Sequence, residues 1–420
     1  MRWRTDGTMG PAGRRWAGAA VALWLWSAAG LASAPRLAGR WDAVVVVNTV
    51  EVPFRFEIAE NDRDVVGFFF EGSRKIASTS GRFENGALTL DYDFMNTVLE
   101  ARVEGGQLRG TYRNKRPNAR PMEFRARRFV PVAGAARRQP QVGGEWVMYR
   151  TAQDASKLDV SWRLHLQESG GEVSGAILKT SGDSGTLVGR WQDGRLTLSH
   201  FAGDRPLVFE AQLNPDGTLG ITLDQKFTYR AARDAELKAK GIPEPPDLSR
   251  FTGVRNPGEL FRFTGSDLDG KMMSDADARF RGRVVVLSIG GTWCPNCRDE
   301  APFLSALYKE FHARGLEVVG LFFENDADPA VVRPRILSFT TRYAVPFPIL
   351  VSGTTNEAPE KLPQLVNFSV FPTTVVLGRD GQVRSVHAGF ASTATGEAHA
   401  QLMREQRALV ERLLTERAAR

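Results

Sequence analysis

Runs in which every second residue is apolar fill the first half of the chain. Phe54, Phe56 and Ile58 alternate with charged residues, and Leu88 and Leu90 flank a threonine. Asn-Gly and Gly-Gly pairs interrupt these runs. A period of two is typical of a strand with one buried face, and such pairs are typical of tight hairpin turns. The pattern predicts short antiparallel strands joined in a meander.

The strand pattern occurs twice along the chain. Gly39-Arg40-Trp41 corresponds to Gly144-Glu145-Trp146 at an offset of 105 residues, and residues 81–90 correspond to residues 189–198 at an offset of 108 residues. A long period with small slips predicts a duplicated domain whose loops differ in length. The two expected all-β modules are residues 36–131 and 143–232.

Each module is expected to hold about eight strands, and two architectures fit such a meander. Closure into a small barrel removes the exposed edges of a sheet, and lipocalin-like barrels also begin with an early Gly-x-Trp. A β-sandwich or open sheet with Trp41 and Trp146 in its core fits the same pattern. The barrel and the sandwich therefore stay open as alternatives.

After residue 250 the pattern changes to apolar runs that alternate with helical periods. Residues 284–289 form an almost continuous apolar run, as in a strand covered on both faces, and Leu304 and Leu307 recur at helical spacing. This alternation predicts an α/β domain over residues 251–420, after a Pro-rich linker at residues 233–250. Further elements are expected at residues 316–323 (strand), 326–343 (helix), 344–351, 373–377 and 382–387 (strands) and 397–420 (helix).

The amino terminus has the layout of a secretory signal. Arg14-Arg15 precede an apolar stretch at residues 16–29, and small residues such as Gly30 and Ala32 follow it. The stretch is shorter than the roughly 20 residues that a transmembrane helix needs, so cleavage is favoured over anchoring. We predict a signal peptide at residues 1–34 and export to the periplasm or the extracellular space. Membrane contact is expected only if the segment stays uncleaved as a tether.

The composition fits a soluble globular protein, with 42% hydrophobic and 25% charged residues in a chain of 420. A formal net charge of +7 raises the question of nucleic-acid binding. The basic residues are interleaved with acidic ones, however, and they form no stripe with aromatic residues. Nucleic acid is therefore not among the predicted partners.

Cys294 and Cys297 are the only cysteines, and they lie three residues apart between a predicted strand and a predicted helix. A thiol at a helix N-terminus faces unpaired N–H groups and the positive end of the helix dipole, so its pKa falls below the free value of about 8.5. A disulfide that served only as a staple would close almost no loop and add little stability. A zinc site wants four ligands, and the five histidines have no paired spacing. The pair is interpreted as a thiol-disulfide exchange site that needs no metal and no cofactor.

Residues 293–302, with the letters W-C-P-N-C-R-D-E-A-P, resemble the W-C-x-x-C-[KR]-x-E-x-P signature of TlpA-like thiol-disulfide oxidoreductases in the thioredoxin superfamily. Residues 370–377 resemble the cis-proline strand of that family. The resemblance covers about residues 251–420 and implies a thioredoxin-like fold there. Ordinary thioredoxins carry an aspartate at the position of Ser288, which leaves Glu300 as the only acid–base group of the motif.

The motif assigns a role to each of its residues. Cys294 is nearest the helix end and is expected to be the more exposed thiol, so it is the predicted nucleophile, and Cys297 is the resolving thiol. Glu300 is expected to be a partly buried carboxyl that exchanges a proton with Cys297. His387 is expected to be an ordinary strand residue. The predicted catalytic residues are Cys294 and Cys297, paired as a disulfide, with Glu300 and Pro372; the predicted substrate-binding residues are Trp293, Phe371 and Thr373.

The sequence thus predicts an exported thiol-disulfide oxidoreductase, in particular a reductase of disulfides in other exported proteins, such as apocytochromes before haem attachment. Its partners would be protein disulfides or dithiols and a thiol electron donor. The β modules would be appended to the active domain and would recognise a partner protein or an unknown ligand. A peroxiredoxin-like thiol peroxidase is one alternative, although Thr292 is too close to Cys294 for the T-x-x-C loop of that branch. A ligand-binding protein with an accessory redox domain is another.

Overall fold

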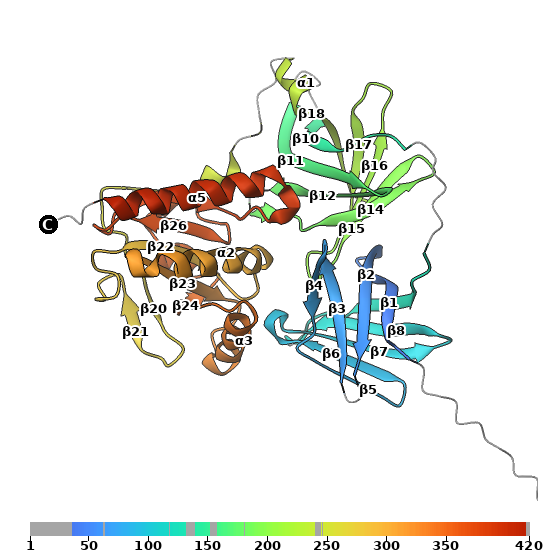
Figure 1. The fold of residues 1–420 in the computed structure, drawn as a ribbon, viewed down its shortest axis with the longest axis horizontal. Coiled ribbons are helices and arrows are strands. Elements are labelled where there is room, and N and C mark those ends of the chain that lie inside the picture. The colour runs from blue at the N-terminus through green and yellow to red at the C-terminus, as the bar shows by residue number, and fades with distance from the viewer. Residues whose placement is uncertain are drawn as a thin grey trace, which may run out of the picture. The chain divides into compact units, whose positions relative to one another are not determined.

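A nine-stranded antiparallel sheet forms the first β module (Figure 1). The computed structural model describes residues 36–416 except 62–63, 117, 132–138, 152–157, 180, 240–244 and 246. The strand order is β4-β3-β2-β1-β9-β8-β7-β6-β5, so the first and last strands are neighbours. The elements are β1 Gly39–Val47, β2 Val50–Glu60, β3 Val65–Glu71, β4 Arg74–Ala77, β5 Ser80–Glu84, β6 Ala87–Tyr92, η1 Asp93–Met95, β7 Thr97–Glu104, β8 Gln107–Asn114 and β9 Met122–Arg128.

The first sheet curls until β5 lies against β3. A Cβ atom on Gly81 of β5 would lie 2.0 Å from the carbonyl oxygen of Val65 in β3, so glycine permits this close approach. Phe56 and Ile58 of β2 are buried in the core, as their alternation with polar residues predicted. The sheet is therefore barrel-like, with an apolar interior.

The second β module closes into a barrel because β11 pairs with both β10 and β12. The ring contains β10–β12 and β14–β18, and the sandwich alternative is wrong for this module. Its sheet also has nine strands rather than about eight, since the short β13 pairs with β12 outside the ring. The strands are β10 Gly144–Thr151, β11 Leu158–Ser169, β12 Glu172–Lys179, β13 Gly182–Asp183, β14 Leu187–Gln192, β15 Arg195–His200, β16 Leu207–Leu213, β17 Leu219–Leu223 and β18 Phe227–Arg233.

The two β modules share a set of contacts around their first tryptophan. The indole N–H of Trp41 donates to the Leu37 carbonyl at 3.0 Å, and that of Trp146 donates to the Val142 carbonyl at 2.8 Å. In each module a guanidinium lies over the indole ring, at 4.1 Å and 3.9 Å from the ring centres, and the two arginines are Arg128 and Arg233. These matched contacts support our proposal that the modules arose by duplication.

The C-terminal domain has the predicted thioredoxin-like fold. Its seven-stranded sheet has the order β21-β20-β24-β23-β22-β26-β27, with β22, β23 and β24 parallel and β26 antiparallel to β22. Apolar side chains of α2, α3 and α5 pack with those of β22 and β23 in one cluster. The elements are η2 Leu248–Arg250, β19 Gly253–Val254, β20 Thr264–Ser266, β21 Met272–Ser274, β22 Val284–Gly290, α2 Pro295–Phe311, η3 His312–Arg314, β23 Leu316–Glu324, α3 Pro329–Arg342, β24 Ile349–Thr354, α4 Ala358–Lys361, β25 Leu365–Val366, β26 Thr373–Leu377, β27 Val383–Ala388, η4 Thr393–Thr395 and α5 Glu397–Thr415.

The predicted linker at residues 233–250 is partly folded. β18 ends at Arg233, and a short helix, α1 (Asp234–Ala239), follows it directly. Leu237 of α1 is buried against Val147 of β10, so this apolar residue attaches the start of the linker to the second module. The predicted signal peptide lies outside the described residues. In the part of the chain that is described, no helix is long and apolar enough to cross a membrane.

A loop of the second module completes the core of the first. This loop, residues 201–206, connects β15 to β16. Phe201 is 2% exposed, and its ring centre lies 4.7 Å from that of Phe54 and 5.3 Å from that of Tyr112. The Tyr112 hydroxyl donates to the Gly203 carbonyl at 2.8 Å. The two β modules therefore share one apolar interior at this point.

Candidate active site

The two cysteines lie at the junction of β22 and α2. β22 is buried along its whole length, and Cys294 is the N-cap residue of α2. The N–H of Cys297 donates to Sγ of Cys294 at 3.2 Å, and the two residues form a disulfide. After reduction, a sulfur in this position faces the positive end of the helix dipole, which favours its thiolate.

Both cysteines are buried in the oxidised structure. Cys294 is 2% exposed and Cys297 is 4% exposed, so the prediction that Cys294 is the more exposed thiol is wrong. Both cysteines are shielded because segments of the β modules, distant in sequence, contact the first turn of α2. The assignment of Cys294 as the nucleophile now rests on its helix-terminal position and stays a prediction.

The loop before β26 contacts Trp293, the residue that precedes the first cysteine. The Phe371–Pro372 peptide bond is cis, and the rings of Phe371 and Trp293 meet edge to face with their centres 5.3 Å apart. Both aromatic side chains are half-buried. The side chain of Thr373, in contrast, is fully buried and its hydroxyl donates to the Val370 carbonyl at 2.8 Å. The backbone of Thr373 is buried as well, in the ladders that β26 forms with β22 and β27, so a substrate contact at Thr373 stays a prediction.

Glu300 of α2 is a buried carboxyl with two hydroxyl partners. It accepts hydrogen bonds from Ser288 at 2.6 Å and from Thr374 at 2.5 Å. Burial raises the pKa of Glu300 above its ordinary value, and the two hydroxyl donors offset part of that rise. A carboxyl with a raised pKa is suited to accept and return a proton during thiol exchange. Ser288, which replaces the thioredoxin aspartate, anchors this carboxyl instead of supplying a second one.

A small cavity lies next to Glu300. It has a volume of about 10 Å³ and is also lined by Thr374 and His387, which face each other in the β26–β27 ladder. This space is close to what a single water molecule needs. Burial lowers the pKa of His387, which favours its neutral imidazole in the strand position predicted for it.

A second buried carboxyl, Glu324 at the end of β23, holds the loop that precedes the cysteines. It accepts hydrogen bonds from the backbone N–H of Thr292 at 2.7 Å and from the Thr292 hydroxyl at 2.8 Å. Burial raises the pKa of Glu324, and the bonds from Thr292 oppose that rise. No sequence pattern indicated this contact, because the two residues are 32 positions apart.

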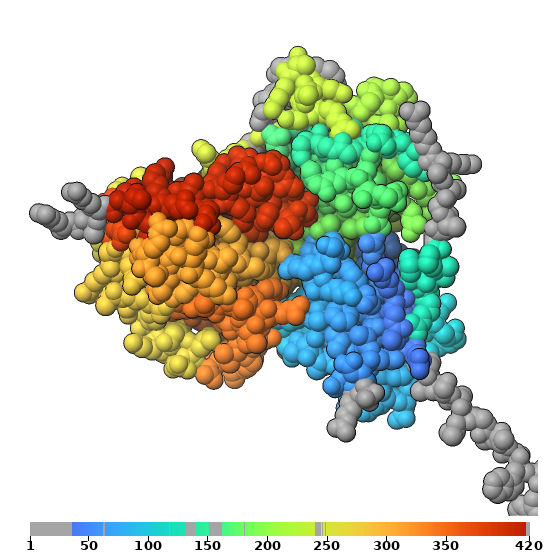
Figure 2. Space-filling model, viewed as in Figure 1, coloured from blue at the N-terminus to red at the C-terminus, as the bar shows by residue number. Residues whose placement is uncertain are grey.

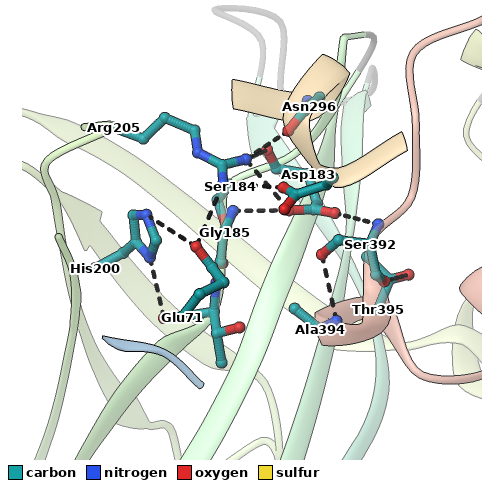
Figure 3. A network of polar contacts seen from close by, with 12 residues as sticks. Glu71, Asp183, Ser184, Gly185, His200, Arg205, Asn296, Ser392, Ala394 and Thr395 are labelled. Carbon is teal, nitrogen blue, oxygen red and sulfur yellow. Dashed lines mark hydrogen bonds and ion pairs between the residues drawn. The ribbon is translucent and has the colours of Figure 1, made fainter. Parts of the chain in front are cut away.

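A polar network joins both β modules to the first turn of α2 (Figure 3). Arg205 of the second module donates to Oδ1 of Asn296 and, at 3.2 Å, to Oδ2 of Asp299. Nδ2 of Asn296 donates to the Ser181 carbonyl at 2.6 Å. Arg74 of the first module donates to Oδ1 of Asp299 at 2.7 Å. Residues of both modules thus contact the segment that carries the cysteines.

Strand β13 docks beside this network. Gly182 forms a parallel bridge with Phe390, and Asp183 accepts a hydrogen bond from the Ser392 N–H at 2.5 Å. A Cβ atom on Gly182 would lie 2.3 Å from the backbone carbonyl oxygen of Phe390, and φ of Gly182 is 111°, so the approach requires glycine. The green surface of the second module adjoins the red C-terminal segment in Figure 2, as these contacts require. The β modules therefore contact the active domain directly, which the predicted linkers did not suggest.

No sequence pattern indicated the residues of the β modules that reach this site. Asn296 was visible as a variable position of the C-x-x-C. Arg205 lies in a loop and Asp183 in the two-residue strand β13, and neither belongs to a periodic pattern or a motif. No group of three or more His, Cys, Asp or Glu side chains among the described residues is placed to hold a metal ion. The site as described offers the Cys294–Cys297 disulfide, the buried carboxyl of Glu300 on the same helix and a surrounding polar network.

The C-terminal domain resembles known redox proteins. The Redoxin family model matches residues 252–402. Thiol-disulfide oxidoreductase ResA of Bacillus anthracis is 28% identical over 118 residues, which cover 28% of this chain and 61% of ResA. ResA of Geobacillus thermodenitrificans is 27% identical over 124 residues, which cover 30% of this chain and 64% of that protein. The chain therefore spans less than two thirds of the length of these relatives.

Solved structures that match this chain include two bacterial redox proteins. A thiol:disulfide interchange protein of the thioredoxin family from Chlorobium tepidum is 22% identical, with 39% of this chain and 99% of that chain covered and a TM-score of 0.29. A secreted thiol-disulfide isomerase from Corynebacterium glutamicum is 22% identical, with 41% and 97% covered and a TM-score of 0.32.

Proposed function

Because residues 252–402 form a redoxin domain of the thioredoxin superfamily with a TlpA-like motif, we propose that this protein is a thiol-disulfide oxidoreductase. The observation that carries the proposal is the Cys294–Cys297 disulfide at the N-terminus of α2, with the buried carboxyl of Glu300 on the same helix. A disulfide that only stabilised the fold would need neither a position at a helix terminus nor a buried carboxyl on the same helix.

In the proposed reaction the reduced protein transfers two electrons to a substrate disulfide. The Cys294 thiolate attacks one substrate sulfur, which forms a mixed disulfide and releases the other substrate sulfur as a thiolate that takes up a proton. Glu300 accepts the proton of Cys297, and the Cys297 thiolate then attacks Sγ of Cys294. This step restores the Cys294–Cys297 disulfide and releases the second substrate sulfur as a thiolate, which takes up the proton that Glu300 accepted. A thiol electron donor reduces that disulfide by the same exchange in reverse.

We assign the reductase direction and exported protein disulfides as substrates within the same proposal. The charged, apolar and small-residue order of the first 34 residues supports export. The β modules would supply recognition of the partner protein. An open pocket of about 410 Å³ on the second module supports that role, because it combines aromatic rings with cationic groups. It is lined by Tyr149, Arg150, Lys226, Phe227, Thr228, Tyr229 and Arg230.

The proposal is tested with the full chain in two assays. The protein is expected to catalyse reduction of insulin disulfides by dithiothreitol, and equilibration with glutathione is expected to give a constant that places it on the reducing side of protein disulfide isomerase. An oxidising equilibrium constant would reverse the direction of exchange. Rapid consumption of hydrogen peroxide without insulin reduction would instead favour the thiol peroxidase.

We predict that Glu300→Gln slows insulin reduction at pH 7 on the order of 10²-fold and flattens its pH dependence, because the substitution removes the titrating group but keeps its shape. Glu310→Gln is the matched control, since Glu310 lies on the same helix but pairs with Arg407 at the surface. The measurement is the rate of insulin reduction from pH 5 to pH 9. Equal rates and pH profiles for the two variants would show that Glu300 has no part in proton transfer.

The same variant is expected to change how stability depends on pH. Burial raises the folded-state pKa of Glu300 above its ordinary value of 4.5, so folding favours the protonated form. The wild-type free energy of unfolding should therefore fall as pH rises above the ordinary value and through the raised pKa. Glu300→Gln lacks this loss, and urea unfolding across that range measures the difference.

A further inference from the structure

The loop that carries Arg205, residues 201–206, is anchored in the first β module. Phe201 anchors the loop in the core of the first module, and the Gly203 carbonyl accepts the Tyr112 hydroxyl. Arg205 itself has a left-handed backbone conformation, with φ of 47°, and its side chain is 18% exposed. The guanidinium is thus presented to α2 from a backbone that the β modules hold in place.

Arg205 contacts two residues on one face of the first turn of α2. Asn296 and Asp299 are three positions apart, which brings their side chains together on the helix surface. The Asn296 side chain is held at both ends by the second module, because its oxygen accepts from Arg205 and its nitrogen donates to the Ser181 carbonyl. Asn296 also immediately precedes Cys297.

Four carboxylates surround the Arg205 guanidinium. Its nitrogens lie 3.2 Å from Asp299, 3.4 Å from Glu71, 3.5 Å from Asp204 and 3.7 Å from Asp183. The side chains of Asp299, Glu71 and Asp183 are at most 7% exposed, and that of Asp204 is 24% exposed. Arg205 is therefore the shared cation of an acidic cluster beside the first turn of α2. Arg74 also pairs with Asp299, at 2.7 Å, and Arg298 pairs with Asp204. Loss of Arg205 would therefore leave Glu71 and Asp183 in particular poorly compensated.

We propose that Arg205 is a positioning residue for the dithiol: it orients the first turn of α2 through Asn296 and Asp299 and balances the acidic cluster beside it. The N–H of Cys297, which donates to Sγ of Cys294, belongs to this turn. A displaced turn and an excess of negative charge both make the Cys294 thiolate less favourable. Arg205 thus links the state of the two β modules to the reactivity of the cysteines, which is a role within the proposed exchange reaction.

The test uses the reduced full-length protein and compares Arg205→Met with Arg195→Met. Arg195 is exposed on the same module and pairs with Glu210, so its replacement is the matched control. The first readout is the pH dependence of cysteine alkylation by iodoacetamide, read at Cys294 by mass spectrometry. Arg205→Met is expected to move its midpoint to higher pH and to slow alkylation at pH 7 about threefold or more, whereas Arg195→Met leaves it unchanged.

The second readout is the equilibrium with glutathione. A less favourable thiolate favours the oxidised form, so Arg205→Met is expected to shift the equilibrium constant about threefold or more towards the protein disulfide. Because alkylation needs no disulfide substrate, an unchanged alkylation midpoint would overturn the positioning role without affecting the proposed exchange activity. Conversely, loss of insulin reduction in the wild type would overturn the proposed function without affecting the alkylation result.

Arg205→Lys and Asn296→Ala keep the proposal falsifiable if Arg205→Met does not fold. Lysine keeps the charge but loses the planar fork, so Arg205→Lys is expected to show a smaller shift in the same direction. In the Asn296→Ala background, Arg205→Lys should add less than it does alone, because the two residues act through one contact. The folded Arg205 variants could instead show unchanged alkylation midpoints and unchanged glutathione equilibria, with only a lower melting temperature. That result would mean that Arg205 only stabilises the fold, and it would overturn the proposal.

Discussion

Cys294→Ser is expected to abolish disulfide exchange, and Cys297→Ser is expected to accumulate mixed disulfides with the substrate. Cys294 lies at the helix end, where the N–H of Cys297 reaches its sulfur at 3.2 Å, so its thiolate is the stabilised one. Loss of a nucleophile that acts as part of a unit lowers catalysis on the order of 10³-fold or more. Without Cys297, nothing remains to release the substrate from Cys294. The measurements are insulin reduction for both variants and trapped adducts by mass spectrometry.

Ser305→Ala is the control for both cysteine variants. Ser305 lies on α2 and is buried, but its hydroxyl has no hydrogen-bond partner among the described residues, so its loss should leave exchange intact. The role assignment is reversed if Cys294→Ser forms stable adducts through Cys297 while Cys297→Ser forms none. That result would mean that position at the helix end does not decide which thiol attacks.

Phe201→Ala is expected to lower the free energy of unfolding by about 3–5 kcal/mol. The substitution removes a ring that is 2% exposed and packed between Phe54 and Tyr112, and it leaves a cavity in a core built from two modules. The loss should appear as an earlier urea transition of the β modules, followed by circular dichroism. Because Phe201 joins the cores, both modules should lose stability together.

Phe227→Ala is the matched control for this loss. Phe227 belongs to the same module but is 43% exposed, so its truncation should cost less than about 1 kcal/mol. Equal losses for the two variants would show that the Phe201 ring contributes no more than a surface residue. Loss of stability confined to the second module would show that the two cores unfold independently.

The sequence predicted those parts of the fold that depend on local pattern. β22 and α2 follow from an apolar run and a helical period, and the C-x-x-C at their junction fixes the position of the cysteines. Glu300 was identified from the resemblance of residues 293–302 to the TlpA-like signature, and its burial agrees with the buried carboxyl that this resemblance implies. Closure of the second module could not be read from the sequence, because alternation specifies strands and one buried face without specifying whether the last strand meets the first.

The parts that could not be predicted depend on contacts between segments far apart in the chain. Arg205 and Asn296 are separated by 91 residues, and neither belongs to a periodic pattern that would connect them. The expected exposure of Cys294 was wrong for the same reason, since a helix terminus is open to solvent only when no other segment packs on it. The apparent linkers also suggested independent modules, although Phe201 crosses from one module into the core of the other.

Amide hydrogens along β5 should exchange with deuterium sooner than those of the corresponding strand β14. Among the described strands, β5 stands at the end of its sheet and is hydrogen-bonded to β6, whereas β14 is paired with both β12 and β15. An edge strand can open without breaking a second ladder, so its protection is set by local opening instead of global unfolding. The first module would therefore open locally along β5 while its aromatic core stays packed. The second module, whose barrel is closed by hydrogen bonds, would show no such local opening along β14.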